Sequence, residues 1–231
     1  MARRRVNTTK LEIIQTATRM FLENGYSATS IKAIANALDM STGHLTFYFP
    51  AKEHLLAELV DMLCSFQWAL MKQYVQEGES LLMAICLELT SMAEICEENE
   101  IAKDFFISAY THSLTLEIIR KNDAQRAKLV FAEYCPDWSD RQFAEVETLV
   151  SGVEYATLMT TGDSAPIDMR ISGALNNIMM LYQVPEEMRR QKIQRALSMD
   201  YRAIGRTVLQ EFMAYIEETN EQAFEELLRR K

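Results

Sequence analysis

The segment that most restricts the fold of this chain lies between residues 29 and 53. Its apolar residues recur at helical spacing in two short runs, and Asp39 stands where the chain must turn between them. Aspartate is one of the few residues besides glycine that tolerate a left-handed backbone. Pro50 stops the second run, and Lys52 follows in the first turn of the next helix. The segment therefore predicts a helix-turn-helix.

The rest of the chain also favours helices. The whole chain of 231 residues has only 7 glycines and 4 prolines. No strand-like alternation bounded by turn residues is found. We therefore predict an all-α protein. The predicted helices cover about 8–24, 30–38, 41–48, 52–76, 80–98, 100–112, 115–134, 139–161, 167–182, 186–197 and 200–228.

Local signals predict where the first helices begin and end. Hydroxyl side chains are good N-terminal caps, and a glycine commonly follows a helix C-terminus. The expected caps are Thr8 or Thr9, then Thr29 or Ser30, then Ser41, with Gly25 ending the first helix.

The sequence predicts two domains, a head at residues 1–53 and a body at 54–231. The head has seven basic and four acidic residues (net +3), and the body has 17 basic and 29 acidic residues (net −12). Phosphate attraction is local and screened within about 10 Å, so a basic head on an acidic body suits DNA binding. No Gly/Ser linker separates them, and the helix after Pro50 is predicted to transmit movement between them.

The sequence gives no support for several other classes of protein, namely membrane-spanning, secreted and metal-binding proteins. No stretch approaches the roughly 18 apolar residues of a membrane span, and the N-terminus lacks the apolar region of a secretory signal. Four cysteines, at 64, 86, 96 and 135, have no metal-site spacing. They are expected to be reduced, buried thiols of a cytoplasmic protein, with redox sensing as the alternative. We expect no catalytic residue, metal or cofactor.

The second helix of the pair is expected to enter the major groove, which is about 12 Å wide and accepts one helix. Hydroxyl and imidazole groups can bond base edges, a glycine lets the backbone approach, and an aromatic ring can touch a thymine methyl. The predicted base readers are Ser41, Thr42, Gly43, His44 and Phe47.

Phosphate contacts are predicted for Thr29 and Ser30 at a helix N-terminus, and for Tyr48 and Lys52. An arm formed by Arg3, Arg4 and Arg5 before the first helix could enter an adjacent minor groove. The alternatives are that Tyr48 belongs to the core, that His44 contacts no base, and that the arginines are only a solvated terminus.

Residues about 8–56 resemble the DNA-binding domain of the tetracycline-repressor (TetR/AcrR) family. The resemblance rests on Ile14, Ala17, Phe21, Gly25-Tyr26, Thr29, Ile34-Ala35, Ser41, Gly43, Leu45, Tyr48-Phe49-Pro50, Lys52-Glu53 and Leu55. Two positions depart from the family pattern. Asp39 stands where glycine is usual, and Thr46 stands where an aromatic residue often contacts a phosphate.

The resemblance implies a homodimer whose C-terminal helical domain supplies an effector pocket and the dimer interface. Candidate pocket residues are Met62, Phe66, Trp68, Met83, Cys86, Met92, Phe105, Phe106, Tyr110 and His112, with ordinary core as the alternative for each. Such a lining favours an apolar or aromatic ligand.

Family dimers commonly pair their last long helices into a four-helix bundle, for which 139–161 and 167–182 are the candidates and 200–218 an alternative. The interface candidates are Phe143, Val146, Leu149, Val150, Gly152, Val153, Ala156, Ile171, Leu175, Ile178 and Met179. Burial within the monomer is the alternative.

The sequence thus predicts a ligand-responsive DNA-binding regulator, usually a repressor in this family. Its dimer would bind a near-palindromic operator, and a small effector would release it. One alternative is an interaction protein with a degenerate head, suggested by Asp39 and Thr46. The other alternative is an enzyme, although the three histidines of the chain belong to no recognisable triad or metal motif.

Overall fold

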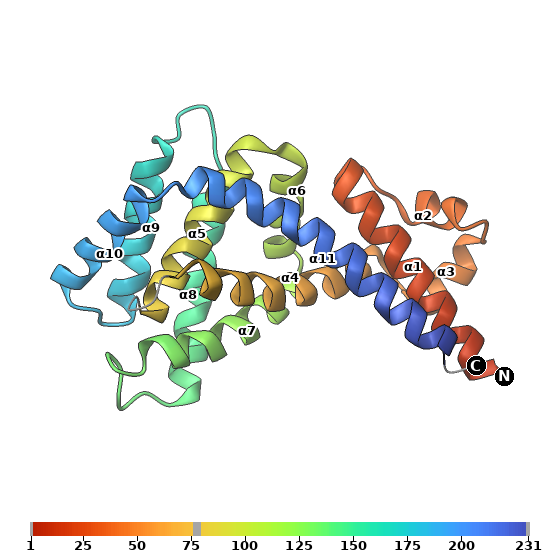
Figure 1. The fold of residues 1–231 in the computed structure, drawn as a ribbon, viewed down its shortest axis with the longest axis horizontal. Helices are drawn as coiled ribbons and strands as arrows, with labels where there is room; N and C mark the ends of the chain where they lie inside the picture. Colours follow the sequence, from red (N-terminus) through yellow and green to blue (C-terminus); the bar gives the residue numbers. More distant parts are fainter. Residues whose placement is uncertain (1, 76–79, 230–231) are drawn as a thin grey trace.

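The computed structural model describes the backbone of residues 2–75 and 80–229 and the side chains of 9–75 and 80–218. Over these residues the chain is all-α, as predicted, with eleven helices and no strand (Figure 1). The helices are α1 (Ala2–Asn24), α2 (Ile31–Ala37), α3 (Thr42–Tyr48), α4 (Lys52–Tyr74), α5 (Leu81–Glu98), α6 (Glu100–Thr111), α7 (Ser113–Phe131), α8 (Asp140–Leu158), α9 (Ile167–Leu181), α10 (Glu186–Ser198) and α11 (Tyr201–Arg229).

The head is formed by α1, α2 and α3. Ile13, Ala17 and Phe21 recur every four residues along α1 and are almost completely buried, because that spacing places them on one face. Ile34 of α2 and Leu45 of α3 are also buried in the core. The two short helices are therefore held through their apolar faces against the longer one.

The structure corrects the predicted start of the first helix. Helix α1 begins at Ala2, so neither Thr8 nor Thr9 is its N-terminal cap. The residues from Ala2 onward include three arginines, which are good helix formers, and no proline or glycine interrupts them. Gly25 does end the helix as predicted, with a positive φ of 91°.

Helix α4 connects the head to the body (Figure 1), which comprises α4–α11. It contacts α1 in the head and α5, α6, α7 and α11 in the body. Helix α4 is unbroken between Lys52 and Tyr74, so the head and the body share one continuous element.

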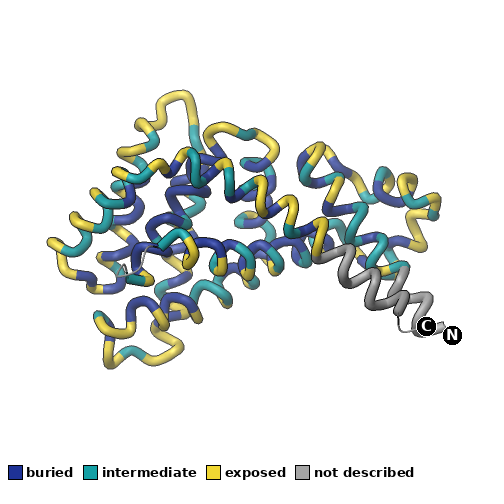
Figure 2. The backbone as a smooth tube through the Cα atoms, in the orientation of Figure 1, coloured by how far each residue is buried: buried dark blue, intermediate teal, exposed yellow. Residues whose placement is uncertain are grey.

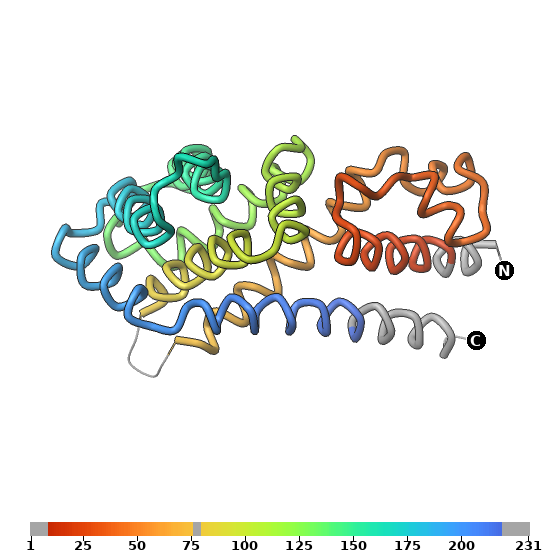
Figure 3. The backbone as a smooth tube through the Cα atoms, turned by 90° about the horizontal axis from the view of Figure 1, so that it is seen from above, coloured from red at the N-terminus to blue at the C-terminus, as the bar shows by residue number. Residues whose placement is uncertain are grey.

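Helix α5 is the centre of the body and is buried along most of its length (Figure 2). It contacts α4, α6, α8, α9, α10 and α11. Gly205 of α11 allows one close approach, because a Cβ there would lie 3.3 Å from the Ser91 carbonyl oxygen. From this crossing the described part of α11 continues past the body and lies along α1 (Figure 3).

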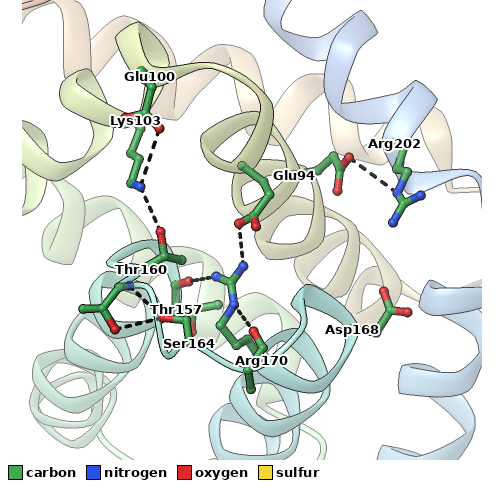
Figure 4. A network of polar contacts seen from close by, with 12 residues as sticks. Glu94, Glu100, Lys103, Thr157, Thr160, Ser164, Asp168, Arg170 and Arg202 are labelled. Carbon is green, nitrogen blue, oxygen red and sulfur yellow. Dashed lines mark hydrogen bonds and ion pairs between the residues drawn. The ribbon is translucent and has the colours of Figure 1, made fainter.

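A polar network fixes the α8–α9 loop against α5 and α6 (Figure 4). The guanidinium of Arg170 donates to a Glu97 carboxylate oxygen at 2.5 Å and to the Thr157 carbonyl oxygen at 2.7 Å. The ammonium of Lys103 donates to Thr160 Oγ1 at 2.8 Å. This network therefore holds the start of α6 against the loop that follows α8.

All four cysteines are buried, free thiols, as the sequence predicts. Burial raises the pKa of Cys86 and Cys96 to about 12, so these thiols stay protonated at neutral pH. Among the described helices, none is both long and apolar enough to cross a membrane.

Candidate DNA-binding face and body cavity

The turn between α2 and α3 has the geometry that the sequence predicts. Asp39 adopts a φ of 50°, in the left-handed region, so the residue that replaces the usual glycine is accommodated. The Ser41 hydroxyl then accepts a hydrogen bond from the His44 backbone N–H at 3.2 Å and caps α3. Ser30 caps α2 in the same way, by accepting from Ala33.

The residues predicted to read bases lie on the exposed face of α3. Ser41, Thr42, Gly43, His44 and Phe47 are all exposed, and 77% of Phe47 is accessible to solvent. A Cβ added to Gly43 would meet no atom within 4 Å. The arrangement leaves α3 free to enter a groove.

Two of the residues predicted to contact phosphates, Thr29 and Lys52, have hydrogen-bond partners within the protein. The Thr29 side chain is buried and donates to the Gly25 carbonyl oxygen at 2.8 Å, so its hydroxyl is not on the DNA-facing surface. The Lys52 ammonium donates to the carbonyl oxygens of Tyr26 and Thr29 at 2.7 and 2.8 Å and lies 3.9 Å from the Tyr26 ring centroid. Lys52 thus holds the start of α4 against the loop before α2.

The other predicted contacts with the DNA backbone stay predictions. Ser30 is exposed and Tyr48 is half-buried, with its ring 5.4 Å from that of Phe47. The structure places Arg3, Arg4 and Arg5 within α1 rather than in an arm before it. Their side chains lie outside the described residues, so the minor-groove contact stays a prediction.

The body encloses a cavity of about 60 Å³ between α4, α5, α6, α7, α8 and α9, here called the body cavity. Its walls combine apolar and aromatic groups with an unexpected set of charges. The lining is Val60, Leu63, Cys64, Gln67, Ile85, Glu88, Leu89, Met92, Phe106, Ala109, Tyr110, Ile119, Asp123, Arg126, Ala127, Phe131, Glu147, Val150, Glu154, Ile178 and Tyr182.

Arg126 is the one cation of this lining. It lies 2.9 Å from a carboxylate oxygen of Glu88 and 3.4 Å from one of Asp123, and it also donates to the Cys64 carbonyl oxygen. Burial raises the pKa of Glu88, and the neighbouring Arg126 opposes that rise. This part of the wall is therefore a compensated ionic group.

The two carboxyl groups of α8 have neutral partners. Glu147 accepts a hydrogen bond from the Tyr182 hydroxyl, and Glu154 accepts one from the Tyr110 hydroxyl at 3.0 Å. Burial raises the pKa of Glu147 to about 7 and that of Glu154 well above its usual range. The carboxylates of Asp123, Glu147 and Glu88 add to the rise at Glu154.

A second cavity of about 40 Å³ lies among α1, α4, α5, α6 and α11 and is here called the α1–α11 cavity. Its lining includes Phe21 of α1, Phe212 of α11 and Phe105 of α6. Leu63, Gln67 and Phe106 belong to both linings.

The structure bears on every predicted pocket residue. Met92, Phe106 and Tyr110 line the body cavity, and Phe105 and Phe106 line the α1–α11 cavity. Six predicted pocket residues line neither of these two cavities: Met62, Phe66, Trp68, Met83, Cys86 and His112. They pack elsewhere, because helical periodicity shows which face of a helix is apolar but not which element that face meets.

Two of these six have identifiable neighbours. Phe66 packs against Phe212 and Tyr215 of α11, with ring centroids 5.4 and 5.0 Å away. His112 lies at the contact between head and body, 5.4 Å from the Tyr26 ring centroid and 3.9 Å from a Glu53 carboxylate oxygen. Neither is placed to touch a ligand in the cavities described above.

The charged lining was missed from the sequence, although a signal existed. Glu147 and Glu154 are seven residues apart, two helical turns, and share a face of α8 with buried Phe143 and Val150. A carboxylate that recurs on the apolar face of a helix is uncommon, since burying a charge is costly. That pattern could have marked the cavity.

A third site joins the body to the head. The Asp104 carboxylate of α6 accepts hydrogen bonds from the Ser27 backbone N–H at 2.8 Å and from the Ser27 hydroxyl. It also lies close to Gly25, where a Cβ would be 3.0 Å from Asp104 Oδ2. The loop that precedes α2 is therefore tied to α6 as well as to Lys52.

The predicted dimer interface divides into buried and exposed residues. Phe143, Val150, Ile171, Leu175, Ile178 and Met179 are buried within the single chain. For these six the structure agrees with the alternative of burial within the monomer, and the dimer interface itself stays a prediction. Leu149, Gly152 and Ala156 are exposed on one face of α8, and Val146 and Val153 are half-buried.

Comparison with known proteins agrees with the geometry of the head. A family model described as "Bacterial regulatory proteins, tetR family" matches residues 13–59. The uncharacterized HTH-type transcriptional regulator YuxN of Bacillus subtilis (strain 168) is 32% identical over 93 residues, which are 40% of this chain and 31% of that protein. The probable HTH-type transcriptional regulator YttP of the same strain is 36% identical over 58 residues, 23% of this chain and 28% of that protein.

The chain thus spans less than a third of the length of these two curated relatives. The crystal structure of Thermus thermophilus FadR, a TetR-family transcriptional repressor in complex with lauroyl-CoA, has the same fold with a TM-score of 0.57. It shares 16% identity, and the match covers 77% of this chain and 96% of that chain. Residues 13–59 thus match the tetR family of bacterial regulatory proteins, and the chain as a whole shares the fold of a TetR-family repressor.

Proposed function

We propose that this protein is a DNA-binding transcriptional regulator that acts as a homodimer on a near-palindromic operator, as a repressor. The observation that carries the proposal is the exposed face of α3, which lies within the segment matched by the family model. Two heads would place their α3 helices in major grooves one helical turn apart, roughly 34–36 Å.

A degenerate head is less well supported than the sequence alone suggested. The left-handed backbone of Asp39 preserves the turn without the usual glycine. Thr46 donates to the Gly43 carbonyl oxygen at 3.2 Å within α3, so the second departure from the family pattern also leaves the helix intact. The remaining difference from the family pattern is the phosphate contact of the aromatic residue that Thr46 replaces.

For the effector, we propose a small organic molecule with an apolar or aromatic part that binds in the body. Support comes from the apolar and aromatic walls of the body cavity and from FadR, a protein of the same fold that binds lauroyl-CoA. The present volume of about 60 Å³ is small for a drug-sized ligand, so the walls must move when one binds.

That movement has direct routes to the head. The body cavity is lined by residues of α4 and α6. The start of α4 is fixed to the head through Lys52, and α6 is fixed to it through Asp104. A ligand that favours one spacing of these helices would shift the population of head positions and so release the operator.

Binding of the purified protein to labelled duplexes from the region upstream of its own gene tests this function. We expect tight binding relative to a scrambled duplex, with affinity that falls as salt rises. Phe47→Ala should reduce the discrimination between the two duplexes, whereas Leu129→Ala, at an exposed position on α7, should not. Equal affinity for both duplexes at all salt concentrations would contradict the proposal.

A further inference from the structure

The charge of the body cavity is out of balance. Four carboxyl groups and one guanidinium line it, and Arg126 pairs with Glu88 and Asp123. Glu147 and Glu154 are left with tyrosine hydroxyls as their hydrogen-bond partners. A tyrosine donates one hydrogen bond but brings no positive charge, so burial favours the protonated form of both carboxyl groups, and a cation entering beside them would stabilise their ionised forms.

Unpartnered atoms face the same space. Glu147 is 3% exposed and Gln67 is 3% exposed. Glu147 Oε2 and Gln67 Nε2, both on residues that line the cavity, are buried without any hydrogen-bond partner within the described part of the chain. Buried polar atoms are nearly always paired in folded proteins, so two orphans in one cavity wall point to a missing partner. The ionised Glu147 oxygen requires a donor, and the Gln67 amide N–H requires an acceptor.

The remaining walls define what carries that donor. Phe131 and Tyr182 stack with ring centroids 4.1 Å apart, and Phe106 and Met92 add apolar surface. Aromatic faces attract cations, and the carboxyl groups ionise more readily beside a cation than beside an anion. No group of three or more metal-ligating side chains is found in the described residues, so the geometry does not favour a metal ion. A compact positive group on an apolar chain fits these walls.

We propose that the body cavity binds an organic ammonium ion, with its nitrogen between Glu147 and Glu154 and its carbon chain against the aromatic wall. This inference deepens the proposed function, since it assigns a chemical class to the effector of the same site. An ammonium has three N–H donors, enough to serve Glu147 Oε2 and Glu154 together. It refines the apolar or aromatic ligand predicted from the sequence by adding a positive charge.

The test compares ligands that differ only in their polar end. Thermal unfolding of the full-length protein is followed with n-alkylammonium ions from ethyl to hexyl, and with the alcohols and carboxylates of the same chain lengths, at constant ionic strength. We expect the ammonium ions to raise Tm in a concentration-dependent way, and the alcohols and carboxylates to have little effect.

Two variants and a control locate the effect. Glu147→Gln and Glu154→Gln keep the size of the side chain and an oxygen acceptor for the tyrosine, and each should weaken ammonium binding by at least about tenfold. Glu117→Gln, at an exposed position on α7, removes a carboxylate outside the cavity and should leave binding unchanged. Far-ultraviolet circular dichroism establishes that each variant is folded.

The outcomes separate this inference from the proposed function. Absence of any ammonium-dependent shift, equal binding of alcohols or carboxylates, or full binding by Glu147→Gln would overturn the inference and show that the carboxyl groups serve only the fold. Operator binding is measured independently on the same samples. Operator binding without ammonium binding leaves the regulator proposal standing, and ammonium binding without operator binding rejects only the regulator.

Discussion

At the scale of single residues, the left-handed backbone at Asp39 is the clearest example of a conformation that the local sequence could predict. A left-handed φ of 50° suits glycine and is tolerated by aspartate, while a Cβ without a short polar group is disfavoured there. Asp39→Ala should therefore lower the free energy of unfolding by about 1 kcal/mol, and Asp39→Gly should stay within about 0.5 kcal/mol of the parent.

Urea denaturation of both variants checks this. Asp163→Ala, at an exposed loop position without a positive φ, is the control and should have no effect beyond about 0.5 kcal/mol. Equal destabilisation by alanine and glycine at position 39 would show that the aspartate side chain, rather than the backbone conformation, stabilises the turn.

Glu147 makes stability depend on pH. Its pKa is raised by burial from the ordinary 4.5 to about 7, so the folded state holds its proton more tightly than the unfolded state does. The corresponding stability is fully present below about pH 4.5 and is lost as pH rises through about 7, a loss on the order of 3 kcal/mol. The charged and titratable groups around it are Glu88, Tyr110, Asp123, Arg126, Glu154 and Tyr182.

Chemical denaturation between pH 5 and pH 8 should show this fall in the parent protein and a shallower one in Glu147→Gln. Glu154 shifts in the same direction, so part of the slope should survive in the single variant. The Glu117→Gln control should retain the parent slope. A parent curve that is flat or rises over this range would contradict the burial of a protonated carboxyl group.

At the scale of the helices, the sequence was sufficient where an element is determined by its own residues. The ends of α2 and α3 follow from Ser30, Ser41 and Pro50, whose capping and chain-stopping chemistry is local. The start of α1 was wrong because a capping threonine also fits inside a helix when nothing upstream breaks it. Local signals predict possible ends, and tertiary packing selects among them.

The candidate sites depend more on contacts between helices, and there the sequence was less informative. Ile171 and Met92 are both apolar helical positions and both are buried, yet only Met92 lines the body cavity. Thr29 reads as a surface hydroxyl near DNA, but it is buried against the end of α1. Burial is a property of the neighbours that a face meets, which periodicity does not specify.

The attachment of α4 to the head gives a prediction for an element. Lys52→Met removes two hydrogen bonds to carbonyl oxygens and the contact with the Tyr26 ring, so unfolding should become easier by about 2 kcal/mol. Lys32→Met on α2 removes an exposed lysine and should change stability by less than about 0.5 kcal/mol.

The salt dependence of DNA binding by the same pair of variants shows whether Lys52 also touches a phosphate. Loss of one phosphate contact lowers the slope of log affinity against log salt by about one. Two of the three ammonium donors of Lys52 have internal partners, and we expect the third to reach DNA. Unchanged stability in Lys52→Met would contradict the attachment of α4 described above.

For the whole molecule, the exposed stripe of α8 provides the test of the proposed homodimer. Leu149 is 57% exposed, and Gly152 and Ala156 continue the same face with small side chains that permit close helix contact. Leu149→Glu should convert a dimer into a monomer in light scattering and weaken operator binding by more than about tenfold, because the two heads no longer act together.

Leu129→Glu is the matched control, since it places the same charge at a 69% exposed leucine on α7 outside this stripe. It should remain dimeric. A dimer that persists in Leu149→Glu would redirect attention to α11, the alternative helix considered from the sequence.

The wall shared by the two cavities has a consequence for ligand length. Leu63, Gln67 and Phe106 are all that the two linings have in common, and they separate spaces of about 60 and 40 Å³. Side-chain rotation at these three positions would join the spaces into one channel from the body cavity toward α1 and α11. Short ligands would then occupy only the near end, and long ones would extend between the helices that hold the head. The length of a ligand would then decide which helices it contacts, in addition to whether it binds.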